Sequence, residues 1–154
     1  MDIPSLGVTR VARVHVRLGP VQTLGPTAAG LRRIIPITGG TIDGDRLTAE
    51  ILPGGADWQL VHDDGTAVID TRYAARTGDG ALIYLATAGV RHAPRAVLDR
   101  LAAGEPVDPA EYYFRLTARL EAGAPRYAWL NRTVFVATAA RAASAVTYDL
   151  YSLD

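Results

Sequence analysis

The chain has 154 residues, which is enough for one domain that buries about 70% of the surface its unfolded chain would expose. Its 16 basic and 16 acidic residues cancel, and neither sign forms a long run, which argues against nucleic-acid binding as the main role. Cysteine and lysine are absent, which excludes disulfides, thiolate metal ligands, cysteine nucleophiles, Schiff-base lysines and phosphate-loop lysines.

The predicted elements begin with a strand over residues 8–18, where Val14 and Val16 alternate with charged residues. Such alternation places one face of a strand in a core and the other in water. In the next strand Pro36 cannot donate a ladder hydrogen bond and Gly39-Gly40 invites a bulge, so we expect a bend there. All the strands that we predict span residues 8–18, 32–41, 47–60, 66–77, 81–90, 112–121, 133–140 and 145–153.

One short helix is expected between the fifth and the sixth of these strands. Pro94 suits a first helical position, Leu98 and Leu101 form an apolar stripe, and Gly104 sits where a helix ends. Asp108-Pro109 predicts a cap and the start of one further turn. About eight strands and one helix predict a mainly β fold, a small antiparallel barrel that occupies residues 1–154 as a single domain.

A first candidate site follows a glycine pair, where Asp57 and Gln59 share one strand face and Trp58 lies on the other. A carboxylate beside an apolar wall can have its pKa raised toward that of a working general acid or base. We therefore treat Asp57 as a candidate catalytic residue and Gln59 as a candidate ligand contact. The alternative is that Asp57 caps a turn and Trp58 belongs to the core.

Two further pairs share strand faces by the same alternation. Asp70 and Arg72 can orient an anion or an enolate if their face points into the barrel, whereas on a solvated face such an ion pair contributes little. Tyr113 and Arg115 can clamp a carbonyl or carboxylate, although both are also ordinary residues of an exposed strand face. Asp70, Tyr113 and Arg115 are thus candidate catalytic residues, and Arg72 is a candidate ligand contact.

Asn131 is the only asparagine in the chain and aligns by alternation with Trp129 and Tyr127. An amide beside aromatic rings suits a pocket that fixes an apolar ligand by one hydrogen bond. Trp129 and Asn131 are therefore candidate ligand-binding residues. The alternative is a loop that an aromatic side chain anchors.

No spacing supports a metal or cofactor site, and we expect neither. His15, His62 and His92 lie far apart and match no metal-ligand motif. The glycines of residues 39–44 lack the order and the following helix of a dinucleotide loop, and no serine sits in a nucleophile elbow. Without a signal segment or an apolar run that could cross a bilayer, we expect no membrane contact and a cytoplasmic location.

Five sequence blocks carry a family resemblance: RIIPITGG (33–40), LPGGADWQ (52–59), GALIY (80–84), EYYFR (111–115) and WLN (129–131). Through these blocks the chain resembles domain-of-unknown-function family 3237 over nearly its whole length. The resemblance implies a lipocalin-like antiparallel β-barrel of a bacterial, mostly uncharacterised family, and it points to the eight candidate residues named above. It implies no particular substrate.

By elimination we expect a cofactor-independent enzyme, an isomerase, lyase, dehydratase or cyclase, that acts on a small apolar or aromatic carbonyl compound. Covalent catalysis lacks its usual nucleophiles here, whereas aspartates as bases and Tyr, Arg or Asn as oxyanion donors remain. The alternatives are a carrier for a hydrophobic metabolite and an interaction module with a filled barrel. Exposed sheet edges are also consistent with a homodimer.

Overall fold

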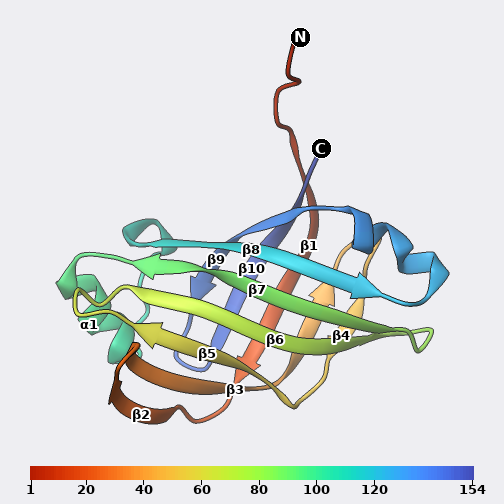
Figure 1. The fold of residues 1–154 in the computed structure, drawn as a ribbon. Helices are drawn as coiled ribbons and strands as arrows, with labels where there is room; N and C mark the ends of the chain where they lie inside the picture. Colours follow the sequence, from red (N-terminus) through yellow and green to blue (C-terminus); the bar gives the residue numbers. More distant parts are fainter.

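The computed structural model describes all 154 residues and shows a closed antiparallel β-barrel whose ten strands fill eight positions around the axis (Figure 1). This confirms the predicted fold class. The strands are β1 (Val8–Leu18), β2 (Gln22–Thr27), β3 (Gly30–Asp43), β4 (Ala49–Ile51), β5 (Gly55–Val61), β6 (Ala67–Thr77), β7 (Leu82–His92), β8 (Tyr113–Ala122), β9 (Phe135–Arg141) and β10 (Ala145–Leu153).

The long strand β3 closes the barrel because its two halves have different neighbours. Its first half pairs with β2 and β5, and its second half pairs with β1 and β4. The expected bend lies between the halves, where the β1–β3 register shifts and Gly39 and Gly40 both have positive φ. A Cβ on Gly40 would lie 2.0 Å from the carbonyl oxygen of His15, so this close crossing requires glycine.

The helical segments cover the two ends of the barrel. The helix α1 (Arg95–Ala102) and the strand β2 lie at one end, and the 3-10 segment η2 (Pro125–Arg132) lies at the other (Figure 1). Asp108 caps the short 3-10 turn η1 (Pro109–Glu111) by accepting a hydrogen bond from the Ala110 N–H at 2.9 Å, as predicted. None of these segments has the length and apolarity that a bilayer-spanning helix needs.

Three parts of the chain differ from the prediction. The strand β2 was not predicted because it contains Gly25 and Pro26 and lacks apolar alternation, and it forms only by pairing with β3. Residues 47–60 form two strands rather than one, because the turn before Gly55 separates β4 from β5. Residues 127–131 form part of the 3-10 segment η2, so the alternation rule for strands does not apply to them.

Alternation along the strands fills the barrel with apolar side chains. In β8, Phe114, Leu116, Ala118 and Leu120 are buried, while the residues that alternate with them are exposed. The same period of two runs through β1 and β6, and the inward residues join one core. Any charged residue at an inward position is therefore surrounded by this core.

The pairing of β1 with β10 carries an ion cluster on its outer face. Asp149 on β10 accepts hydrogen bonds from Arg10 at 2.8 Å and from Arg13 at 2.9 Å through both of its oxygens. These two arginines lower the pKa of Asp149 from 3.8 to about 2, against a smaller opposing effect of burial. The ionised carboxylate therefore stabilises the folded barrel.

Replacing Asp149 by Asn should lower the free energy of unfolding by about 1 kcal/mol at neutral pH, measured by urea denaturation. Because the folded-state pKa is lowered, this stabilisation is complete above the ordinary pKa of 3.8 and is lost as the pH falls through about 2. The difference between variant and wild type should therefore shrink in acid. Asp2→Asn, in the exposed N-terminal segment, is the control, and an equal loss in both variants would contradict the assignment.

Candidate functional site

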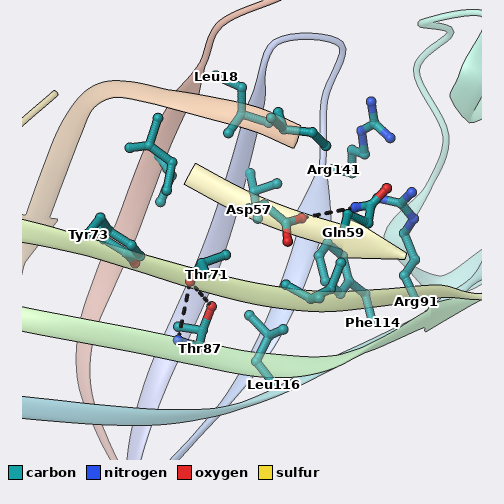
Figure 2. A pocket seen from close by; sticks show the side chains of 15 residues that line it. Leu18, Asp57, Gln59, Thr71, Tyr73, Thr87, Arg91, Phe114, Leu116 and Arg141 are labelled. Carbon is teal, nitrogen blue, oxygen red and sulfur yellow. Dashed lines mark hydrogen bonds between the residues drawn. The ribbon is translucent and has the colours of Figure 1, made fainter. Parts of the chain in front are cut away.

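An interior cavity of about 40 Å³ lies between β1, β3 and β5–β10, near the end of the barrel that α1 covers (Figure 2). Most of its lining is apolar, with Ile35, Phe114 and Leu116 among the wall residues. Its polar lining residues are Asp57, Gln59, Thr71, Tyr73, Thr87, Arg91 and Arg141. A space of this size holds a few water molecules or one small group of a ligand rather than a whole metabolite.

A second hollow, of about 300 Å³, forms the mouth beside α1. Leu98 and Leu101 of α1 contribute apolar surface to it. Arg91 and Arg141 line both the mouth and the interior cavity, so their side chains stand where the two hollows meet. We call the outer hollow the mouth and the interior cavity the inner cavity.

Asp57 is the only carboxylate that lines the inner cavity. One of its oxygens accepts a hydrogen bond from the backbone N–H of Asp70 at 3.0 Å, and the other accepts one from the Gln59 amide at 3.0 Å (Figure 2). Burial raises the pKa of Asp57, and the two hydrogen bonds and the charge of Arg91 oppose that rise in part. The structure thus holds a fixed carboxylate with a raised pKa beside an apolar wall.

Gln59 links Asp57 to a neighbouring strand. Arg33 lies directly opposite Gln59 in the β3–β5 pairing, and its guanidinium donates two hydrogen bonds to the Gln59 Oε1, at 2.6 and 3.1 Å. Since Oε1 accepts from Arg33, the amide nitrogen is the atom that faces Asp57, and it donates there. The chain from Arg33 through Gln59 to Asp57 therefore fixes the orientation of the amide and of the carboxylate.

Three inward arginines, Arg33, Arg91 and Arg141, gather around this one carboxylate. Burial lowers the pKa of all three, and repulsion from neighbouring guanidinium groups lowers the pKa of Arg91 and Arg141 further. The lowering of the pKa is greatest for Arg91, whose pKa falls to about 10. The guanidinium carbon of Arg91 lies 5.5 Å from the centre of the Phe114 ring. Arg91 Nε is the one buried side-chain polar atom of the protein that has no hydrogen-bond partner.

Hydroxyl groups line the deeper part of the cavity. The Thr71 and Thr87 hydroxyls share a hydrogen bond of 2.5 Å, and the buried Tyr73 hydroxyl shares one with Tyr148. Burial raises the pKa of Tyr148 to about 12 and that of Tyr73 well above its ordinary value. Both phenols are therefore neutral at physiological pH and can donate a hydrogen bond but cannot act as bases.

Two of the eight predicted site residues, Asp57 and Gln59, line the cavity. Trp58 points outward and is 37% exposed, so it is not part of the core. Asp70 and Arg72 lie on the outer face of β6, where they form an exposed ion pair of 3.9 Å. The proposed role of this pair depended on its face pointing into the barrel, and that face points outward, because Ile69, Thr71 and Tyr73 occupy the inward positions.

The four remaining predicted residues also lie outside the cavity. Tyr113 and Arg115 are exposed because Phe114 takes the inward position of β8, and Tyr113 stacks on His92 instead. Trp129 is half-buried beneath the guanidinium of Arg46, 3.9 Å from its ring centre. Asn131 is exposed, and its amide bonds both backbone groups of Ala122.

Asp70, Arg72 and Asn131 do share a surface feature, an open groove of about 740 Å³ over the outer faces of β7 and β8. The groove is larger than the inner cavity, but it is open to solvent. Its charged pair is exposed, and its one amide is fully used in holding Ala122. Without a desolvated polar group, this groove lacks the means to shift a pKa or to stabilise a developing charge.

The sequence analysis missed Arg33, Arg91 and Arg141, although the signal was present. In β7 the inward positions run Ile83, Leu85, Thr87, Gly89 and Arg91, with a period of two. Extending each apolar alternation to the end of its strand in the same way would have identified Arg33 on β3 and Arg141 on β9. No group of His, Asp and Glu side chains in the structure is arranged to hold a metal ion.

Comparisons with known proteins place the chain among uncharacterised barrels. Residues 6–153 match the family DUF3237, described as a protein of unknown function. A UPF0311 protein of Rhodopseudomonas palustris is 39% identical over 150 residues, which are 97% of this chain and 98% of that protein. The crystal structure of a beta-barrel like protein from Acinetobacter baumannii AYE has a TM-score of 0.88 and 50% identity, and covers 99% of both chains.

A more distant solved structure is described as an enzyme from Penicillium herquei. It has a TM-score of 0.74 and 16% identity, and the match covers 100% of this chain and 99% of that one. At this identity the likeness shows the fold alone.

The electrostatic arrangement predicts how the pKa of Asp57 responds to its neighbours. Arg91→Met and Gln59→Leu should each raise the pKa of Asp57, because each removes a group that stabilises the carboxylate. Asp70→Asn should lower it, because Asp70 repels the same charge. The side-chain carbonyl resonance of Asp57, followed by NMR against pH, measures all three shifts, and an Asp57 pKa below the ordinary 3.8 in the wild type would contradict the arrangement.

Proposed function

The chain belongs to DUF3237, a family of unknown function, and we propose that its barrel is a cofactor-independent enzyme that moves a proton on a small carbonyl compound. This class includes isomerases, lyases, dehydratases and cyclases. The observation that carries the proposal is Asp57, a fixed carboxylate of raised pKa in a mostly apolar cavity that also holds the cation Arg91. A proton acceptor and a charge that stabilises an oxyanion are the two parts such a reaction needs.

In the proposed reaction Asp57 takes a proton from the carbon next to the substrate carbonyl. The electron pair of that C–H bond forms the enolate, and the negative charge moves to the carbonyl oxygen. Arg91 lines the same cavity and lacks a partner for its Nε–H, so it is the donor that we assign to this oxygen. In an isomerisation Asp57 then returns the proton to another carbon. In a lyase reaction the enolate electron pair forms a C=C bond and expels a group with its bonding pair from the carbon next to the deprotonated one, and the leaving group takes the proton from Asp57.

The surroundings of Asp57 suit this role. Each oxygen accepts one hydrogen bond from the protein and has a further lone pair for a substrate proton. The backbone N–H of Asp70 and the Gln59 amide restrain the carboxylate, so little reorganisation precedes proton transfer. The neutral phenol of Tyr73 and the hydroxyls of Thr71 and Thr87 are available to orient a polar group of the substrate.

The Penicillium herquei structure supports the proposal only at the level of the fold, because it indicates that a barrel of this kind can belong to an enzyme. The rival function is a carrier that holds a metabolite without changing it. One observation favours the carrier: both oxygens of Asp57 already have hydrogen-bond partners, as they would in a purely structural network. Exchange of substrate protons with solvent separates the two functions, because a carrier has no reason to catalyse it.

We therefore predict that the protein catalyses solvent deuterium exchange next to the carbonyl of its ligands. A panel of cyclic enones, lactones, aromatic acids and polyketide-like ketones, screened by thermal shift, supplies the ligands to test. Asp57→Asn should retain ligand binding but lose exchange by about 100-fold or more, since the amide cannot accept the proton. Proton NMR in deuterated buffer measures the rate.

Asp45→Asn is the matched control, because it changes an exposed aspartate between β3 and β4 that lies outside the cavity and does not contact Asp57. It should exchange at close to the wild-type rate. Equal exchange by wild type and Asp57→Asn would contradict the assigned role of Asp57. Ligands that bind without any exchange would favour the carrier.

A further inference from the structure

We propose that the ligand carries a carboxylate and that Arg91 and Arg141 bind this group where the mouth meets the inner cavity. The inference rests on the proposed function in one respect: the bound carbonyl compound is taken to be the substrate of that chemistry. It adds the substrate class, an apolar carbonyl compound with one carboxylate.

Positive charges outnumber negative charges around the inner cavity. Arg33, Arg91 and Arg141 surround a single carboxylate, Asp57, and none of the three takes part in any ion pair of the structure. Two positive charges are therefore unbalanced in a site where Arg91 is buried and Arg33 and Arg141 are partly buried. Buried charges in proteins are normally paired, so this excess points to an anion that the protein receives from outside.

The guanidinium groups at the junction also have hydrogen-bond donors that no protein group uses. Arg33 spends two of its donors on Gln59, but the guanidinium groups of Arg91 and Arg141 donate no hydrogen bond to the protein. Arg91 is only 7% exposed, and its Nε–H has no partner at all. Guanidinium groups match the two oxygens of a carboxylate in geometry and in charge. A carboxylate between these two side chains accepts hydrogen bonds from their terminal NH₂ groups, and the Arg91 Nε–H is left for the substrate oxyanion.

The two hollows differ in size. The inner cavity of about 40 Å³ admits only a small group, whereas the mouth of about 300 Å³ accommodates the rest of a small molecule. Val21, Leu98 and Leu101 give the mouth apolar surface. A carboxylate at the junction therefore leaves the apolar body in the mouth and lets one small part of the ligand reach toward Asp57.

A carboxylate fits this site better than a phosphate. Asp99 lines the mouth and Asp57 lies in the inner cavity, so an incoming anion meets repulsion from both. For a dianion the attraction of the arginines and the repulsion of these two carboxylates both double, whereas the cost of losing hydration rises with the square of the charge and therefore favours the monoanion. The site thus selects a single negative charge.

Two probe pairs test the proposal: benzoate with benzamide, and propanoate with propanamide, which match in shape and differ in charge. Isothermal titration calorimetry of the wild-type protein should give at least about 10-fold tighter binding of one acid than of its amide. Arg91→Met and Arg141→Met should each reduce that preference to about 3-fold or less, while the affinity for the amide stays within about 3-fold. Arg115→Met, on the outer face of β8, is the control and should keep the preference.

Two results would overturn the proposal: a lack of preference for the acid in both pairs, or tighter binding of inorganic phosphate than of either acid. Arg91→Lys guards against a folding defect, because it keeps the charge and should retain part of the preference. The proposed function fails separately. Preference for the acids without deuterium exchange in any ligand would refute the enzyme function and keep the carboxylate site. Exchange of uncharged ketones without preference for the acids would keep the enzyme function and refute the carboxylate site.

Discussion

Closure of the barrel is the constraint on which the rest of the structure depends. In a closed sheet, alternate side chains of every strand point into one interior. This alternation continues to the end of each strand, whatever residue stands there. In β3, β7 and β9 that alternation carries Arg33, Arg91 and Arg141 inward at the same end of the barrel, and in β5 it adds Asp57. The site thus forms because these four residues occupy inward positions of strands that meet at one end of the barrel.

Burying these charges opposes stability, and the protein offsets only part of the cost. The Arg33–Gln59–Asp57 chain satisfies the carboxylate and the amide, but Arg91 and Arg141 have neither counter-ion nor hydrogen-bond partner. A barrel filled only with apolar side chains would be more stable, as in many small barrels. Groups that lower stability and face a cavity are characteristic of a site kept for a ligand, because binding supplies the missing interactions.

Alternation and turn residues were sufficient to predict the fold, since most strands, the bend at Gly39-Gly40 and the turn after Asp108 lie where expected. The site was predicted only in part. Asp57 and Gln59 follow a turn that fixes their face, whereas the face of Asp70 and Tyr113 could be judged only against their apolar neighbours, which point inward instead. Asn131 was chosen by strand alternation, which does not apply to it because it lies in a 3-10 segment.

The stability of the unliganded protein tests most directly whether the arginines serve a ligand or the fold. Arg91→Met keeps the apolar stem over Phe114 and removes the buried charge. If the cation is retained for a ligand, urea unfolding without ligand should show the variant to be more stable than wild type by about 1 to 2 kcal/mol. A loss of about the same size would mean that Arg91 supports the fold, and would contradict a ligand site at the mouth of the barrel.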